Sequence, residues 1–420
     1  MLTNIQRCVV LLLQSLVPMT IFPIGIIAQD TSMQGTQTIG YRVTDETGRA
    51  EMSYLSVHNL IIIPVSINGS LPLNFILDCG ISQTIVTDPS LAAMMRLKPE
   101  REINIMGAGG EQQIRANVCT GNRIALHGVR GDGIPVILLQ EDYLSLSAIL
   151  GIPIFGLLGG DIFRELVVSI DYGERRLAFV NPQSFTHPFG YQKVPIRMQG
   201  GKPYLPLHLE QTEGPSLDIE VLADLGASHF LLLETQADER LVIPSRHLPA
   251  NVGFGLSGPI QGSYARAHTV RLGRFRLNKP IISYTQTYNP FEVSRHSHGT
   301  IGGEFLCRFH VIFDLSREVM YFQKNRQYNK IFTQDRSGLG VMAGGNALEQ
   351  IIVYDVRQGS PAWQAGMQAG DRILRLNGAR LRDLDRINTM MRQREGKKIH
   401  IVFERDQQIK EVRFELSEGI

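Results

Sequence analysis

An internal repeat constrains this chain more than any other feature of its sequence. Three pairs of segments resemble each other: 75–82 (FILDCGIS) and 221–228 (VLADLGAS), 157–163 (LLGGDIF) and 300–306 (TIGGEFL), and 167–171 (VVSID) and 310–314 (HVIFD). The pairs occur in the same order and lie 143 to 146 residues apart. A unit of that length has the size of a domain and is too long for a solenoid repeat. We therefore expect two similar lobes.

Each lobe is expected to consist mostly of strands. Apolar runs at 60–67 and 73–77 flank Asn68-Gly69-Ser70, a pattern that predicts a hairpin. A second hairpin is predicted from 167–170 and 177–180, and a strand at 205–209 opens the second lobe. Short helices are expected at 161–166 and 304–309, each with an acidic residue at its start.

Length and composition indicate a globular protein of about three domains. The chain has 420 residues, of which 43% are hydrophobic and 20% charged, and its net charge is +2. A charge so close to balance gives no support for nucleic acid or an anionic membrane as a partner.

The N-terminus has the pattern of a secretory signal peptide. Arg7 supplies a positive charge, residues 8–27 are mostly apolar, and Ala28 precedes a polar segment. Pro18 and Pro23 argue against a membrane-spanning helix, although an uncleaved anchor remains the minority alternative. We expect a signal peptide at 1–28 and an exported bacterial protein, periplasmic or secreted to the cell surface.

The cysteines that remain after removal of the predicted signal peptide do not form a disulfide framework. Cys79, Cys119 and Cys307 are odd in number and widely spaced, and the sequence has no C-x-x-C pair. We expect no metal site and no cofactor. His296-Ser297-His298 is interpreted as a solvated loop because the sequence has no third cluster of ligands for a metal.

Asp78 and Asp224 are the candidate catalytic residues. Each ends an apolar strand and is followed by a glycine two positions later, so a tight turn is allowed there. A pseudo-two-fold axis between the lobes would bring the two carboxylates together, where they would share a proton. One then acts as general base on a water molecule while the other donates to a carbonyl oxygen, which suits amide hydrolysis.

These motifs resemble those of the aspartic peptidases of the pepsin and retropepsin type, over about residues 50–325. The resemblance implies a mostly β, two-lobed protease fold, with lobes at 50–190 and 191–325, and an endopeptidase that hydrolyses peptide bonds. In that family an apolar-apolar-Gly segment supports each catalytic loop, as 157–159 and 300–302 would here. The active-site loops then contain Cys79, Gly80, Ser82, Leu225, Gly226 and Ser228.

The same resemblance implies a glycine-containing flap over the cleft in each lobe. Residues 105–110 (IMGAGG) and 252–258 (VGFGLSG) follow their aspartates at the same distance. Two flaps are therefore expected, as in the retroviral dimer. The flap residues are Met106, Gly107, Gly109, Gly253, Phe254 and Gly255.

The catalytic loops depart from the family pattern. Where the family has Thr or Ser between Asp and Gly, this chain has Cys79 and Leu225. A thiol is a weak donor and leucine is none, so the hydrogen bonds that join the two loops are weakened at a cost of about 1–3 kcal/mol. With Ile81 and Ala227 after the glycines, we expect activity at a milder pH than that of gastric pepsin. A second hypothesis is a catalytically inactive peptide-binding protein, and a third is a protease that processes only itself.

Residues 334–418 resemble a PDZ domain, preceded by a polar, basic linker at 324–330. Residues 359–378 (GSPAWQAGMQAGDRILRLNG) carry the resemblance. It implies that the loop of Gly338, Leu339, Gly340 and Val341 binds a peptide's terminal carboxylate, with backbone amides of Leu339 and Gly340 as donors. The expected partners are a peptide or protein substrate and a peptide C-terminus, although docking of this groove on the protease lobes is an equal alternative.

Overall fold

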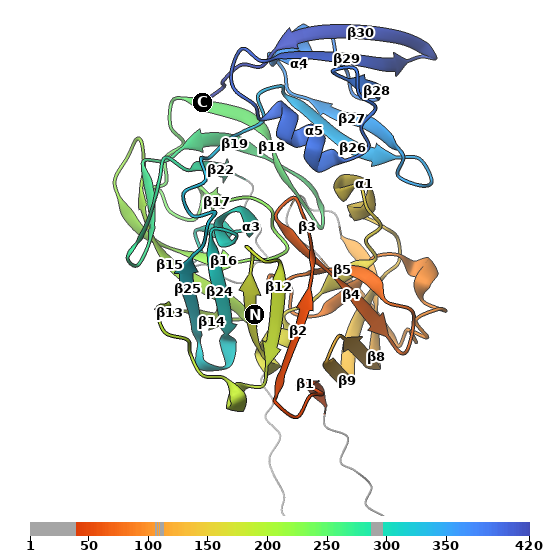
Figure 1. Cartoon of the computed structure of the whole chain (residues 1–420), viewed down its shortest axis with the longest axis vertical. Coiled ribbons are helices and arrows are strands. Elements are labelled where there is room, and N and C mark those ends of the chain that lie inside the picture. Colours follow the sequence, from red (N-terminus) through yellow and green to blue (C-terminus); the bar gives the residue numbers. More distant parts are fainter. Residues whose placement is uncertain (1–38, 106, 108, 110–112, 287–296) are drawn as a thin grey trace, which may run out of the picture. The chain divides into compact units, whose positions relative to one another are not determined.

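A computed structural model describes residues 39–105, 107, 109, 113–286 and 297–420 of the protein (Figure 1). Strands in four β-sheets far outnumber helices in the described chain, which confirms the mostly β fold expected from the sequence. The predicted signal peptide lies outside the described residues. Within the described ranges, no helix is long and apolar enough to cross a membrane.

The first lobe is built on a nine-stranded sheet in which β5 ends at the first candidate aspartate. Asn68 and Gly69 both have positive φ, which allows the tight turn between β4 and β5. β10 runs parallel to β5, with Leu158 opposite Leu77. The sheet has the order β1-β9-β6-β10-β5-β4-β8-β7, with β3 beside β4. Its strands are β1 (Gly40–Val43), β3 (Leu55–Val57), β4 (Leu60–Ile67), β5 (Leu73–Leu77), β6 (Thr84–Val86), β7 (Arg101–Ile105), β8 (Ile114–Leu126), β9 (Val129–Leu139) and β10 (Gly156–Leu158).

The second lobe repeats this arrangement in a ten-stranded sheet. β23 runs parallel to β16, with Ile301 opposite Ala223, so β16 ends at the second candidate aspartate. The order is β18-β19-β22-β17-β23-β16-β15-β20-β21, with β14 beside β15. Its strands are β14 (Arg197–Gln199), β15 (Lys202–Glu210), β16 (Leu217–Ala223), β17 (Leu231–Glu234), β18 (His247–Gly255), β19 (Gly258–Arg266), β20 (Thr269–Leu272), β21 (Phe275–Asn278), β22 (Ile281–Thr285) and β23 (Gly299–Ile301).

A six-stranded sheet joins the two lobes. Its order is β13-β25-β24-β11-β12-β2, and β11 pairs antiparallel with β24 so that Val168 lies opposite Phe313. These two strands are the third pair of repeated segments, so the equivalent strands of the two lobes pair with each other. The strands are β2 (Arg49–Ser53), β11 (Val167–Asp171), β12 (Arg176–Val180), β13 (Gln192–Pro195), β24 (Phe309–Asp314) and β25 (Val319–Lys324).

The C-terminal region forms a five-stranded antiparallel sheet in the order β26-β27-β28-β29-β30 (blue in Figure 1). This region has its own apolar core, in which Ile387 of α5 packs with strand residues such as Val353 and Ile401. The strands are β26 (Leu339–Gly344), β27 (Gln350–Val356), β28 (Arg372–Leu376), β29 (Lys398–Arg405) and β30 (Gln408–Glu415).

Short helices connect the sheets. α3 ends at Leu306 and not at Phe309 as expected from the sequence, because Phe309 begins β24. α5 begins at Leu384, where the carboxylate of Asp383 accepts from the backbone N–H of Arg386 and caps the helix. The helices are α1 (Leu146–Leu150), α2 (Asp161–Glu165), α3 (Gly303–Leu306), α4 (Pro361–Gln364) and α5 (Leu384–Met391), with 3-10 turns η1 (Pro89–Leu91), η2 (Pro182–Ser184) and η3 (Leu315–Arg317).

Candidate active site

Both lobes hold their candidate catalytic aspartate in the same way. The backbone N–H of Asp78 donates to the carbonyl oxygen of Leu158, and that of Asp224 donates to the carbonyl oxygen of Ile301, at 2.9 Å in each case. The apolar-apolar-Gly segments therefore support the two loops, as the resemblance implied. Because β5 and β16 are buried and end at these positions, each carboxyl is placed at the inner edge of its lobe.

Each of the two carboxyls packs against the glycine of the opposite loop. Asp78 Oδ1 accepts from the N–H of Gly80 and Asp224 Oδ1 from the N–H of Gly226, both at 2.7 Å. A Cβ on Gly226 would lie 2.3 Å from Asp78 Oδ2, and one on Gly80 would lie 2.6 Å from the Cγ of Asp224. A side chain at either glycine would therefore occupy the space of the opposite carboxyl, so both positions require glycine.

The electrostatics of the pair favour a shared proton. Burial raises the pKa of both carboxyls, and the pKa of Asp224 reaches about 8 because the nearby charge of Asp78 and their mutual hydrogen bond add to the effect of burial. The same hydrogen bond, donated by Asp224, and the positive charge of Lys202 oppose the rise for Asp78. The raised pKa values are therefore a property of the coupled pair, which favours one shared proton between Asp78 and Asp224.

Cys79 retains one of the two hydrogen bonds that were expected to be weakened. Its Sγ donates to the carbonyl oxygen of Ala223 in the opposite lobe at 3.1 Å. Burial and the two aspartates raise the pKa of the thiol well above its usual range, so Cys79 is a neutral, packed thiol. Leu225 is only 1% exposed and packs in the core that both lobes share.

The serines of the two loops do not have equivalent positions. Ser82 Oγ donates to the carbonyl oxygen of Gly200, which follows β14 in the second lobe. Ser228 lines the cleft, and its carbonyl oxygen accepts from Asn59 Nδ2. The structure therefore brings Asp78, Gly80, Asp224 and Gly226 together, while Ser82 serves as a contact between lobes.

The predicted flaps are the hairpins β7–β8 and β18–β19, which meet tip to tip. The N–H of Gly107 donates to Ser257 Oγ at 3.1 Å, and a Cβ on Gly109 would lie 2.0 Å from the carbonyl oxygen of Gly258. Met106 lies outside the described residues. Gly253, Phe254 and Gly255 are in β18, and the Phe254 ring packs edge-on against Tyr354 of β27 at 5.5 Å between centroids.

A cavity of about 710 Å³ lies between the dyad and the flaps. Apolar side chains from both lobes dominate its walls, and His229 and Lys202 add polar groups beside the aspartates. Sequence patterns did not indicate these two residues, because neither belongs to a motif. His229 is oriented by a 3.0 Å contact of its Nε2 with the carbonyl oxygen of Thr300, and burial lowers its pKa.

The same cavity reaches the C-terminal domain. Leu339, Gly340 and Val341 of β26 line it, together with Tyr354 of β27. His58 of the first lobe is in contact with α5 nearby, where its Nε2 lies 3.1 Å from both Asp385 Oδ1 and Asn388 Nδ2.

Local side-chain acceptors order the predicted carboxylate-binding loop. The N–H of Leu339 donates to Ser337 Oγ at 3.1 Å. The N–H of Gly338 donates to Asp335 Oδ2 at 2.6 Å, and Gly338 has φ +79°, which suits glycine. Binding of a carboxylate by the Leu339 and Gly340 amides stays a prediction.

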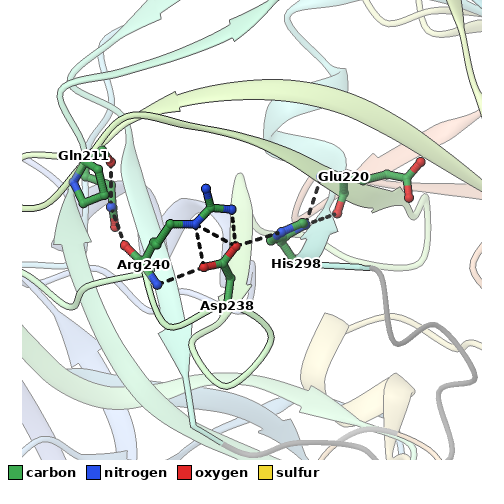
Figure 2. A network of polar contacts seen from close by, with 6 residues as sticks. Gln211, Glu220, Asp238, Arg240 and His298 are labelled. Atoms are coloured by element: carbon green, nitrogen blue, oxygen red, sulfur yellow. Dashed lines mark hydrogen bonds and ion pairs between the residues drawn. The ribbon is translucent and has the colours of Figure 1, made fainter.

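His298 belongs to a polar network and not to a solvated loop (Figure 2). Its Nδ1 accepts from the N–H of Glu220 at 3.1 Å, and its Nε2 lies 3.6 Å from Asp238 Oδ2. Arg240 pairs with the same carboxylate and lowers its pKa. Among the described residues, no three His, Cys, Asp or Glu side chains are grouped to hold a metal, and His296 lies outside those residues.

Comparisons with known families match two regions of the chain. A model of the aspartyl protease family matches residues 63–162, which include Asp78 and the segment that supports it. A model of the PDZ domain matches residues 352–405, from β27 into β29. A comparison with curated proteins finds no match. The chain thus combines a two-lobed β fold of the aspartyl protease type with a C-terminal PDZ domain.

Proposed function

We propose that the protein is an aspartic endopeptidase in which Asp78 and Asp224 hydrolyse a peptide bond through an activated water molecule. The observation that carries this proposal is the crossed packing of the two carboxyls, each over the other lobe's glycine, with the pKa of Asp224 raised to about 8. Such a pair supplies an acid and a base at the same place and at the same pH.

In the proposed mechanism the two carboxyls take different roles. Asp78, in its ionised form, removes a proton from water as the water attacks the scissile carbonyl carbon. Asp224 carries the shared proton and donates it to the carbonyl oxygen, which gives a neutral tetrahedral intermediate. The dyad then returns a proton to the leaving amine as the C–N bond breaks.

The cavity supports an extended peptide with apolar side chains near the scissile bond. Ile81, Ile85 and Leu157 line it from the first lobe, and Leu222 and Ile260 from the second. Because the flaps meet above the dyad through Gly107 and Ser257, a peptide enters only when this contact opens. The flaps then exclude water and hold the peptide over the carboxyls.

The test is the appearance of new N-termini in an unstructured protein substrate, followed by mass spectrometry. Purified protein from Gln29 onward is compared with Asp78→Asn and Asp224→Asn. The matched control is Asp161→Asn, which removes another buried carboxyl that does not line the cavity. Cleavage by the wild type and the control, but by neither dyad variant, supports the proposal.

A second candidate function is peptide binding without turnover, and Leu225 is the observation in its favour. Leu225 supplies no donor to match the Cys79 bond, so the two loops are joined from one side only. A folded wild type that binds an extended peptide but produces no new N-terminus at any pH would establish this function.

We further propose that the protein is exported and that the PDZ domain recognises a peptide C-terminus. Export is supported by the apolar segment 8–27 ahead of Ala28. Recognition is supported by the position of β26 at the end of its sheet, beside α5, where a peptide adds as a further strand in domains of this type. Fractionation of the native host and a peptide-binding assay test the two parts separately.

A further inference from the structure

A helix of the first lobe contacts the groove of the PDZ domain. α1 packs against β26, which ends its sheet and pairs with β27 alone. Gly151, the residue that ends α1, lies against Leu384 at the start of α5, because a Cβ on Gly151 would be 3.1 Å from Leu384 Cδ1. α1 therefore touches both elements that bound the peptide groove.

The same helix is part of the catalytic cavity. Leu146, Ile149 and Leu150 line that cavity together with Asp78 and Asp224. Leu256, at the tip of flap β18–β19, packs against the apolar cluster that contains Leu150. A movement of α1 away from β26 would therefore change the apolar cluster on which the flap tip packs.

We propose that α1 is a built-in competitor at the PDZ groove, and that a peptide with a free C-terminal carboxylate and an apolar last residue binds there by displacing it. The apolar groove residues Leu339 and Val341 fit such a side chain. Arg357 lies beside the loop, with Nη2 3.4 Å from the position of a Cβ on Gly338 and Nη1 3.7 Å from Asp335 Oδ2, so a peptide carboxylate there would share this guanidinium with Asp335. Peptide binding then frees the flap tip and opens the catalytic cavity.

The competition has a thermodynamic consequence. A peptide that binds only when α1 is displaced shifts the protein toward the open state. The apparent affinity of the peptide is its affinity for the open state multiplied by the fraction of molecules in which α1 is displaced. The effect on turnover rests on the proposed protease function, whereas the competition itself does not.

A reversible cross-link tests the competition. The Gly151→Cys, Leu384→Cys double variant places two thiols where the Cβ positions are 3.8 Å apart, the usual separation in a disulfide. Cys79, Cys119 and Cys307 are buried. The probe is a fluorescein-labelled decapeptide that ends in Leu-Val with a free carboxylate, and its C-terminal amide is the control ligand. Binding is followed by fluorescence anisotropy.

We expect the oxidised double variant to bind the decapeptide at least about tenfold more weakly than the same protein after reduction. Each single-cysteine variant should bind equally under both conditions, which controls for strain at Gly151, whose φ is +70°. The amide should bind about tenfold more weakly than the acid to the reduced protein. Equal affinity of the oxidised and reduced double variant would overturn the proposal.

A second readout separates this proposal from the protease function. In an Asp78→Asn background, which is expected to be inactive, the decapeptide should slow formation of the engineered disulfide at least about fivefold, because displacement of α1 moves one engineered thiol away from the other. An unchanged rate overturns the competition. A slowed rate with no effect of the peptide on flap opening or turnover in the active protein would retain the competition and reject the coupling.

Discussion

The Sγ of Cys79 in the first lobe donates a hydrogen bond to the carbonyl oxygen of Ala223 in the second, one residue before Asp224. This contact crosses between the lobes directly beneath the two carboxyls. It replaces one of the two hydroxyl contacts expected in a protease of this type, and Leu225 replaces the other with apolar packing. The alignment of the dyad therefore depends on a thiol from one side and on core packing from the other.

Replacement of Cys79 by alanine should reduce both stability and turnover. We expect a loss of about 1–3 kcal/mol in the free energy of unfolding, from the lost hydrogen bond and the cavity that remains. The value of kcat should fall by roughly tenfold because the two loops are less well aligned. Thermal unfolding and steady-state kinetics measure the two effects, and Cys79→Ser should restore much of kcat.

The matched control for that variant is Cys119→Ala. Cys119 is also buried in the first lobe but lies outside the two catalytic loops. This substitution should cost similar stability and leave kcat within about twofold of the wild type. Equal losses of kcat in both variants would show that the contact between Cys79 and Ala223 has no special part in the alignment.

The rate of cleavage should depend on pH as a broad bell that extends to mildly alkaline conditions. Turnover requires one proton on the pair, and the pKa of Asp224 is about 8, so kcat/KM should fall as pH rises through this value. The acid limb should lie above the ordinary range of an aspartate, because burial raises the pKa of Asp78. A profile measured from about pH 3 to about pH 9 checks both limbs. An alkaline limb near pH 5 would contradict the raised pKa of Asp224.

Stability should depend on pH in opposite senses for two aspartates. The folded pKa of Asp224 is raised above its unfolded value, so its contribution to stability is complete below about pH 4 and is lost as pH rises to about 8. The Asp224→Asn variant has no carboxyl at this position to titrate. Its free energy of unfolding should therefore rise relative to that of the wild type between about pH 4 and about pH 8. The expected rise is on the order of a few kcal/mol, because each pKa unit corresponds to about 1.4 kcal/mol.

Asp238→Asn is the control with the opposite trend. Arg240 and the backbone lower the pKa of Asp238, so its contribution is present above the unfolded pKa of about 4 and is lost in stronger acid. The variant should be less stable than the wild type near neutral pH, by roughly 1 kcal/mol, and the difference should shrink below about pH 4. Denaturant unfolding at several pH values measures both series, and parallel curves for the two variants would contradict the assignment.

The contact between Phe254 and Tyr354 should couple the flap to the PDZ domain. Alanine at both positions, alone and together, forms a double-mutant cycle on the free energy of unfolding. We expect a coupling energy of about 0.5–1.5 kcal/mol, the usual value for an edge-on aromatic pair. Phe189→Ala is the control, since Phe189 is 99% exposed. Coupling close to zero would mean that this contact does not persist in solution.

Much of the two-lobed fold was predictable because the sequence contains an internal repeat. The repeated segments identified both aspartates, and the resemblance to the aspartic peptidases implied the supporting segments and the two flap hairpins. The contact between α1 and β26 was not predictable, because Leu146–Leu150 is a short apolar run without a motif. The partner of the Leu339 amide was missed for a related reason: whether Ser337 Oγ or a ligand accepts from it depends on the rotamer of one side chain.

The most direct test of the proposed mechanism is mass spectrometry of the cleavage reaction in water enriched in oxygen-18, quenched with acid during turnover. Direct attack by water activated between Asp78 and Asp224 predicts one heavy oxygen in each new C-terminal carboxyl and no mass added to the protein. Accumulation of a covalent adduct on the protein, absent from Cys79→Ala, would contradict the account, because the cleavage would then pass through a thioester on Cys79.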